Sequence, residues 1–187
     1  MIYIDDNVQN LDLTAALAAV SDERRQVALR YRQERDQRLC LAAYLLLQRA
    51  VCEQYGIRRL PPFIFGPHGK PSLAGMPHIH FNMSHSRGMA VCAVSDRPVG
   101  IDVERIDHYD AALIARTMNE QEQRAIEQSA DRNMAFIRLW TMKESLLKLT
   151  GEGISRDLHT VLDHRERYRF CTTTLPDHII TVCHPTE

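Results

Sequence analysis

The stretch around which this chain is organised is Phe136-Ile137-Arg138-Leu139-Trp140-Thr141-Met142-Lys143-Glu144-Ser145-Leu146-Leu147-Lys148. At about 100° per residue, one broad arc of the corresponding helix is apolar and contains Phe136, Leu139, Trp140, Leu146 and Leu147. Thr141, Glu144 and Lys148 fall together on the other side, whereas Lys143 projects into the middle of the apolar arc. The pattern predicts a core helix whose second face carries an acid and a base four residues apart.

The simplest interpretation of Glu144 and Lys148 is an exposed ion pair, which stabilises a helix by a few tenths of a kcal/mol. A second acidic stretch, Gly100-Ile101-Asp102-Val103-Glu104, favours a different interpretation. On a strand, Asp102 and Glu104 point to the same face, about 6–7 Å apart. Such carboxylates repel each other unless a cation compensates, and oxygen ligands suit Mg²⁺ or Mn²⁺. A solvent-facing acidic edge is the alternative. Glu144 becomes a third ligand if the helix packs its polar side against this strand.

Length and composition limit the classes of protein to consider. The 187 residues suffice for one domain or for two small halves that share a core. Hydrophobic residues at 44% and charged residues at 25% are typical of a globular protein. A formal net charge of -1 gives no overall field that attracts nucleic acid or an anionic membrane, so we expect neither as a partner. The first residues lack signal-peptide order, and the five cysteines show no Cys-x-x-Cys spacing, so we expect a cytoplasmic protein with reduced thiols.

Hydrophobic periodicity and turn residues predict the order of the elements. Helices are expected at residues 11–31, with Ser21 as an N-cap inside that segment, and at 34–54, 110–118 and 120–129. The opening helix follows, which Asp131 caps and Gly151 ends. Strands are expected at residues 2–4, 63–65, 78–84, 89–94, 99–104, 168–173 and 178–183. The alternation of residues 78–84 predicts a half-buried strand, whereas the apolar run 89–94 predicts a strand covered on both faces. Similar apolar runs at 89–94 and 179–183 come late in each half, which suggests two halves of similar plan.

Several kinds of site have no support in the sequence. It contains no zinc-ligand spacing, no Walker loop, no Gly-x-Gly-x-x-Gly and no Gly-x-Ser-x-Gly. Ser84 and His85 are adjacent on a strand and therefore point to opposite faces, which argues against a nucleophile pair. Four cations each lie beside a turn or on a helix face, namely Lys70, His85, Lys143 and Lys148. Together with three carboxylates and a metal ion, they indicate a site for a diphosphate.

The acidic strand and the stretch from Trp140 to Lys148 resemble the paired signatures of the 4′-phosphopantetheinyl transferases of the surfactin-synthetase-activating type. Two further motifs agree with this family, Gly69-Lys70-Pro71 and Phe81-Asn82-Met83-Ser84-His85-Ser86. Their order and spacing fit from about residue 20 to residue 155, so the resemblance covers most of the chain. Any one motif would be weak, but four in order make the match specific.

The resemblance implies an α+β fold built as a pseudo-twofold pair of similar α/β halves, with coenzyme A bound in the cleft between them. Residues 1–98 would form the half with basic helices and nucleotide contacts, and residues 99–187 the half with the acidic strand and the catalytic helix. The implied reaction is the Mg²⁺-dependent transfer of 4′-phosphopantetheine from coenzyme A to a serine of an apo acyl or peptidyl carrier protein. It releases adenosine 3′,5′-bisphosphate. We expect a monomer.

The resemblance also implies roles for individual residues. The metal ligands by position are Asp102, Glu104 and Glu144. The residues that match coenzyme A contacts are Lys70, Ser84, His85 and Lys148, with Lys148 reaching the diphosphate. Among the basic residues of the N-terminal helices, the nearest candidates for the nucleotide 3′-phosphate are Arg24 and Arg38. Glu144 and Lys148 would be the catalytic residues, with Glu144 the candidate base for the serine hydroxyl.

The residues leave some alternatives open. A carboxylate bound to Mg²⁺ is a weaker base, so Glu144 acts either directly or through a metal-bound water. Lys143 either neutralises phosphate or pairs with an acidic residue in the cleft. Another Mg²⁺-dependent phosphotransferase or diphosphate hydrolase could use the same acids, and a silent carrier-binding module is a third possibility. We predict that Asp102→Ala folds but loses activity. The sequence does not disclose which carrier protein is served.

Overall fold

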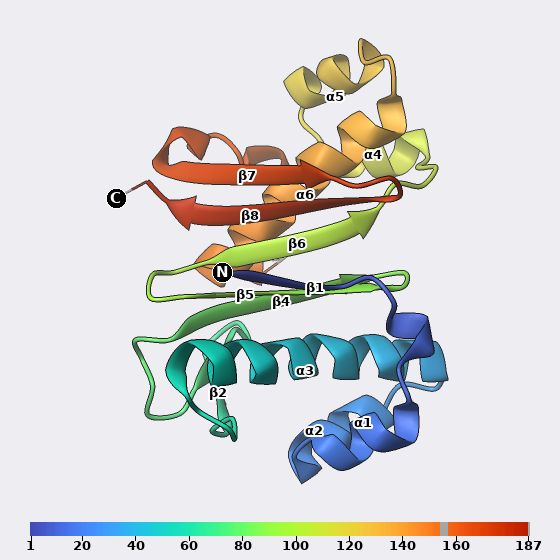
Figure 1. The fold of residues 1–187 in the computed structure, drawn as a ribbon. Coiled ribbons are helices and arrows are strands. Elements are labelled where there is room, and N and C mark those ends of the chain that lie inside the picture. The colour runs from blue at the N-terminus through green and yellow to red at the C-terminus, as the bar shows by residue number, and fades with distance from the viewer. Residues whose placement is uncertain (154–156, 187) are drawn as a thin grey trace.

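The computed structural model describes residues 1–153 and 157–186 and has a mixed α+β fold (Figure 1). The first half contains β1 Ile2–Asp5, η1 Val8–Asn10, α1 Leu13–Ala19, α2 Asp22–Leu29, α3 Glu34–Tyr55, β2 Phe63–Phe65, β3 Pro71–Leu73, β4 His80–Ser86 and β5 Met89–Ser95. The second half contains β6 Gly100–Arg105, α4 Ala111–Thr117, α5 Glu120–Glu127, α6 Arg132–Thr150, η3 Leu158–Thr160, η4 Arg165–Arg167, β7 Tyr168–Thr174 and β8 His178–Pro185. Every helix in these described ranges falls short of the length or apolar character that crossing a bilayer requires.

The two halves share one plan, as predicted. Each has a three-stranded antiparallel sheet, with strand order β1-β5-β4 in the first half and β6-β8-β7 in the second. In both sheets the last strand of the half, β5 or β8, lies in the centre, and a long helix, α3 or α6, packs beside it. The two apolar runs recognised in the sequence are these central strands. The predicted α+β fold with two similar halves is therefore confirmed.

The helix ends follow the residues expected to cap them. The Asp131 carboxylate accepts a hydrogen bond from the Met134 amide at the start of α6, and Gly151 ends the helix with a φ of 76°. That left-handed conformation suits glycine, which has no Cβ to clash. The expected helical segment 11–31 is two helices, because the chain breaks at Val20 and the Ser21 side chain caps α2.

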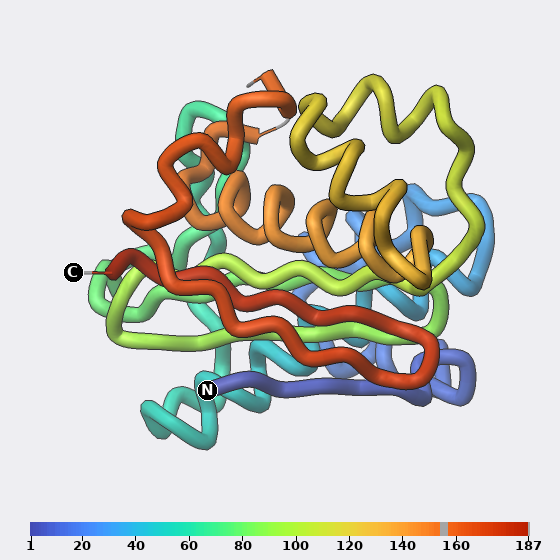
Figure 2. The backbone as a smooth tube through the Cα atoms, turned by 90° about the horizontal axis from the view of Figure 1, so that it is seen from above, coloured from blue at the N-terminus to red at the C-terminus, as the bar shows by residue number. Residues whose placement is uncertain are grey.

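The helix-free faces of the two sheets pack against each other, so that the layers run α3, first sheet, second sheet, α6 (Figures 1 and 2). This inner layer consists of Met89, Val91, Ala93, Val99, Ile101, Val103, Ile180 and Val182. On β4, the prediction of a half-buried strand is wrong. Asn82 and Ser84 on its polar face are both only 7% exposed. The second half of the molecule covers this face, which the alternation of a single strand does not reveal.

Candidate active site

The two halves meet along β4 and β6, which belong to different sheets and run close to each other; we call this line of contact the seam. Within it, Ser84 Oγ donates a hydrogen bond to Asp102 Oδ1 over 2.8 Å. Two residues further along, Ser86 Oγ donates to Glu104 Oε2, also over 2.8 Å. Both acids therefore leave β6 on the face that the strand period predicts, and serine hydroxyls of the other half orient them.

Helix α6 can approach the seam because Gly100 has no side chain. A Cβ at this position would lie 1.9 Å from the carbonyl oxygen of Ser145 and 2.7 Å from the amide nitrogen of Leu149. Neither distance is compatible with van der Waals contact, so only glycine allows strand and helix backbones to lie so close. The polar side of α6 consequently reaches the acids of β6, which is the condition for Glu144 to join them.

Lys148 links α6 to both strands of the seam. Its Nζ donates to Asp102 Oδ1 over 2.6 Å and to Ser84 Oγ over 2.8 Å. Asp102 is buried, whereas 29% of the Lys148 side chain remains exposed. In the described part of the chain no ion pair joins Lys148 to Glu144, so the simple surface pair within the helix is not formed. The ammonium group instead lies where it can meet an anion that enters the seam.

The three acids are close enough to influence one another's ionisation. Burial raises the pKa of the Glu144 carboxyl, the negative charge of Asp102 raises it further, and the Lys148 ammonium opposes the shift. Burial also raises the pKa of Glu104, again reinforced by Asp102, while the hydrogen bond from Ser86 lowers it. These carboxylates therefore repel one another in a poorly solvated place, which a bound cation would relieve.

The donor atoms support a divalent cation, although they are not assembled around one point. Asp102 Oδ2 and Glu144 Oε1 are buried and have no hydrogen-bond partner among the described residues. Unpaired carboxylate oxygens are the ligands that Mg²⁺ or Mn²⁺ prefers. Across residues 1–153 and 157–186, however, no three acidic, histidine or cysteine side chains form a ready metal site. The acids thus fit such an ion by the chemistry of their oxygens, and in this structure the Lys148 ammonium contacts Asp102.

A cavity of about 250 Å³ opens at one end of the seam and brings together three residues expected to act on coenzyme A or its reaction, namely Lys70, Glu144 and Lys148. Lys70 Nζ donates to the Leu149 carbonyl oxygen over 2.6 Å, near the C-terminal end of α6. Burial lowers the pKa of this lysine. The loop that carries Lys70 is thereby attached to α6.

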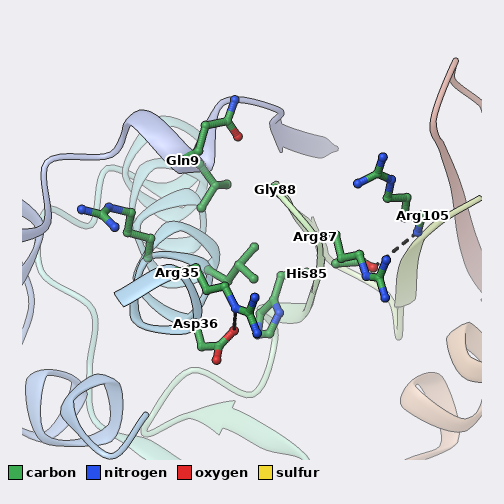
Figure 3. Close-up of a pocket in the computed structure, with 11 residues that line it drawn as sticks. Gln9, Arg35, Asp36, His85, Arg87, Gly88 and Arg105 are labelled. Carbon is green, nitrogen blue, oxygen red and sulfur yellow. Dashed lines mark hydrogen bonds and ion pairs between the residues drawn. The ribbon is translucent and has the colours of Figure 1, made fainter. Parts of the chain in front are cut away.

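A larger cavity of about 830 Å³ opens at the other end of the seam, and Figure 3 shows its walls. It is lined by His85, Ser86 and four arginines, Arg35, Arg38, Arg87 and Arg105, and we call it the arginine cleft. Although the His85 side chain reaches solvent, the surrounding protein lowers its pKa by desolvation, and the positive charges of Lys148 and Arg24 lower it further. His85 is therefore mainly neutral at pH 7 in the absence of an anion.

The structure does not gather all the expected nucleotide contacts in one cavity. Arg38 lines the arginine cleft, where its Nε donates to the Leu11 carbonyl oxygen over 3.0 Å. Arg24 lies over the Tyr44 ring, 5.2 Å from its centroid, and donates to the Cys40 carbonyl oxygen over 2.6 Å. It lines a separate cavity of about 460 Å³, on the side of α2 and the Pro61-Pro62 segment. The expected roles of both arginines toward a 3′-phosphate stay predictions.

Lys143 faces the interior rather than the cleft. Its side chain is 0% exposed, and its Nζ donates to Glu122 over 2.5 Å and to the carbonyl oxygens of Thr117 and Leu158, each over 2.8 Å. The idea that it neutralises phosphate, or pairs with an acid in the cleft, is wrong in this structure. Its partner Glu122 lies in α5, so the pair fastens α6 to the outer helices.

Sequence reasoning missed several residues of the site. Ser86 follows Ser84 by two residues on β4, so the two side chains point to the same face of the strand. This alternation could have placed Ser86 beside Glu104. The close approach at Gly100 and the position of Arg105 in the cleft depend on how the two halves pack. No local sequence pattern predicts the close approach at Gly100 or the position of Arg105.

Two family models match consecutive parts of the chain. Residues 98–183 match the family model described as the 4′-phosphopantetheinyl transferase superfamily, and residues 7–97 match the one described as 4′-phosphopantetheinyl transferase, N-terminal. The 4′-phosphopantetheinyl transferase psf-1 of Bacillus pumilus is 37% identical over 179 residues, which cover 94% of this chain and 76% of that protein.

Two Bacillus subtilis proteins extend the comparison. A 4′-phosphopantetheinyl transferase is 32% identical over 162 residues, covering 84% of this chain and 71% of the relative. The 4′-phosphopantetheinyl transferase Sfp of strain 168 is 28% identical over 160 residues, with the same two shares. With matches of this identity over most of its length, the chain belongs to the 4′-phosphopantetheinyl transferase superfamily.

Proposed function

We propose that this protein transfers 4′-phosphopantetheine from coenzyme A to a serine of an apo carrier protein and releases adenosine 3′,5′-bisphosphate. One observation supports this reaction above others. Lys148 contacts Asp102 and Ser84 at the seam, beside two further carboxylates that burial and like charge leave uncompensated. Such a site suits a charged diphosphate together with a cation. The five cysteines are all free, in keeping with a cytoplasmic location, and we propose a monomer.

We further propose that Mg²⁺ binds to Asp102, Glu104 and Glu144. The unpaired Asp102 Oδ2 and Glu144 Oε1 support this set. A bound Mg²⁺ would supply charge neutralisation to the diphosphate. Because Lys148 now contacts Asp102, its ammonium is expected to turn toward the diphosphate when ion and coenzyme bind. Ser84 would keep its hydroxyl beside Asp102 throughout.

The chain's own residues account for the remaining requirements of the reaction. A bond forms between the acceptor serine oxygen and the phosphorus that carries pantetheine, and the bridging phosphorus–oxygen bond to the nucleotide breaks. The serine proton would pass to Glu144, directly or through water, at a carboxylate oxygen that the ion does not occupy. Lys148 would stabilise the charge that develops on the departing phosphate, and Lys70 would hold the nucleotide side of coenzyme A.

Incubation of the protein with coenzyme A, Mg²⁺ and a panel of apo carrier proteins tests the proposal. The panel should include carriers from fatty acid, polyketide, non-ribosomal peptide and siderophore synthesis, because the site does not disclose which is served. We expect at least one carrier to gain the mass of one phosphopantetheine group. Chelation of the divalent ion should abolish the gain.

Other outcomes would contradict the proposal. Cleavage of coenzyme A without labelling of any carrier would indicate a diphosphate hydrolase built from the same acids. Carrier binding with neither cleavage nor labelling would indicate a silent module. Retained labelling by the Asp102→Ala variant would reject the metal assignment while leaving the transfer reaction intact.

A further inference from the structure

Serine hydroxyls of the first half contact one oxygen on each of the two acids of β6. Ser84 Oγ donates to Asp102 Oδ1, and Ser86 Oγ donates to Glu104 Oε2, each over 2.8 Å. Lys148 Nζ donates to the same oxygen of Asp102 as Ser84 does. The other oxygen, Asp102 Oδ2, is buried and has no hydrogen-bond partner among the described residues. In both acids the serine therefore contacts one carboxylate oxygen and leaves the other to a further ligand.

A backbone group of β6 orients the Ser86 hydroxyl toward Glu104. A serine hydroxyl has one hydrogen to donate and two lone pairs that accept. Ser86 Oγ accepts the backbone N–H of Arg105 over 3.3 Å, so one lone pair faces this amide and the hydrogen is directed to Glu104. The Trp140 side chain provides Glu104 with a further hydrogen bond. Donors of the fold thus determine which parts of the Glu104 carboxylate stay open to a cation.

The register between β4 and β6 keeps both serines in place. These strands belong to different sheets and lie next to each other at the seam (Figure 1). Asn82 Oδ1 accepts the Ile101 N–H and Ser86 Oγ accepts the Arg105 N–H, each over 3.3 Å and each across 19 positions of the chain. Both serine–acid hydrogen bonds span 18 positions. With these constant offsets, neither serine can leave its acid unless several hydrogen bonds of the seam break together.

Divalent cations differ in how they use a carboxylate. Mg²⁺ is small and demands octahedral geometry, so it usually takes a few carboxylates and fills the remaining positions with water and phosphate. Ca²⁺ is larger, accepts a more variable number of oxygens and often binds both oxygens of one carboxylate. A hydroxyl hydrogen directed at one oxygen carries positive partial charge and repels a cation there. A carboxylate held in this way therefore favours coordination through its other oxygen alone.

We propose, on the basis of the metal site and the transferase function above, that the two serines select the metal ion by restricting each acid of β6 to one oxygen. The site consequently binds Mg²⁺ or Mn²⁺ in preference to Ca²⁺. Ser86 is the serine whose role can be tested alone, because Ser84 also contacts Lys148 and is expected to contact coenzyme A. Since Ser86 acts through Glu104, it is a positioning residue.

Calorimetric titration of Mg²⁺ and of Ca²⁺ into the protein saturated with coenzyme A tests this selection. The quantity compared is the Kd for Ca²⁺ divided by the Kd for Mg²⁺. In the Ser86→Ala variant the second Glu104 oxygen loses its donor, so we expect this ratio to fall about tenfold, as loss of a hydrogen bond to a metal ligand typically changes affinity by that factor or more. Ser86→Thr keeps the hydroxyl, and its added methyl group has space in the arginine cleft, which Ser86 lines. Its ratio should stay within about threefold of that of the unaltered protein.

Ser95→Ala is the matched control, because the same two kinds of contact occur at Ser95 outside both cavities of the seam. Its Oγ accepts the Arg97 amide over 3.1 Å and donates to Asp96 Oδ1 over 3.5 Å. The ratio in this variant should equal that of the unaltered protein. A general loss of stability would weaken the binding of both ions alike, so the ratio separates selection from a merely structural effect.

An unchanged ratio in Ser86→Ala would overturn the proposal, and so would an equal fall in Ser95→Ala. If Ser86→Thr fell as far as Ser86→Ala, the hydroxyl would not be the cause of the selection. Failure of the transferase function is observed separately, as the absence of carrier labelling by the unaltered protein, whereas ion selection is measured without a carrier. If the unaltered protein with coenzyme A binds neither ion, the metal assignment fails, and the selection proposal fails with it.

Discussion

Lys143 illustrates how a buried charge differs from the exposed ion pairs that helix periodicity suggests. Its ammonium has three oxygen acceptors and no exposed surface, and the Glu122 carboxylate also accepts a hydrogen bond from the Asn119 amide. Such groups are tolerated in an interior only when every polar atom is satisfied. Removing one partner therefore leaves the other charge buried without compensation.

We predict that Lys143→Met destabilises the protein by about 3–5 kcal/mol, as breakage of a buried pair typically does. Chemical denaturation measures the loss. At a temperature where the variant is folded, its KM for coenzyme A should stay within about twofold of normal, because Lys143 lines none of the cavities at the seam. The double variant Lys143→Met with Glu122→Gln should recover part of the stability. A small loss of stability with a large rise in the KM would instead make Lys143 a phosphate contact.

His85 gives a pH dependence whose sign follows from its surroundings. Because its pKa is lowered below the usual 6.5, the free protein carries a mostly neutral ring at pH 7. The charged ring binds phosphate better, so binding should take up a proton, and the KM for coenzyme A should fall as the pH decreases from about 7.5 toward about 6. Rate measurements across this range test the effect. A His85→Gln variant should have a higher KM and lose this component of the pH dependence; identical profiles in both proteins would exclude the role.

At the scale of elements, the contact between β6 and α6 decides whether the site forms. The strand provides Asp102 and Glu104, the helix provides Glu144 and Lys148, and Gly100 sets the distance between them. Because the groups that a Cβ would meet are backbone atoms, they cannot turn aside as a flexible side chain could. A side chain at position 100 can therefore be accommodated only if the whole helix α6 moves away from β6.

We predict that Gly100→Ala lowers stability by about 1–3 kcal/mol or more, as overpacking does, and reduces kcat/KM for transfer by at least about tenfold. Gly66→Ala is the matched control, because a Cβ there meets nothing closer than 3.7 Å and the residue has no positive φ. Thermal unfolding and transfer kinetics measure the two effects. Normal activity in the Gly100→Ala variant would show that α6 can move outward without loss of the site.

The sequence predicted elements far better than it predicted their contacts. Asp131 and Gly151 mark the ends of α6 because capping depends on residues only a few positions away. Likewise, alternation placed Asp102 and Glu104 on one face. The pairing of Lys148 with Asp102 joins residues 46 positions apart, and it depends on how α6 docks on the other elements. For the same reason, the burial of Asn82 and Ser84 was missed.

At the scale of the whole molecule, neither half holds a complete site. The three candidate metal ligands come from the second half, whereas Ser84, His85 and Lys70 come from the first. A ligand that contacts both sets stabilises the folded chain as a unit, since the unfolded chain has no seam to bind it. Binding should therefore be visible in the unfolding of the entire protein.

Calorimetry of thermal unfolding tests this coupling together with the metal assignment. At a hundredfold excess over its dissociation constant, coenzyme A with Mg²⁺ should stabilise the protein by about 2.7 kcal/mol, which raises the Tm by about 5–10 °C for a chain of this size.

In the Glu144→Gln variant, loss of one repelling charge should leave the Tm without ligand unchanged or higher, because burial and Asp102 disfavour ionised Glu144. The contribution of Mg²⁺ to the shift should vanish in this variant, while coenzyme A alone still stabilises it through Lys70 and Lys148. An undiminished Mg²⁺ shift would remove Glu144 from the proposed ligand set.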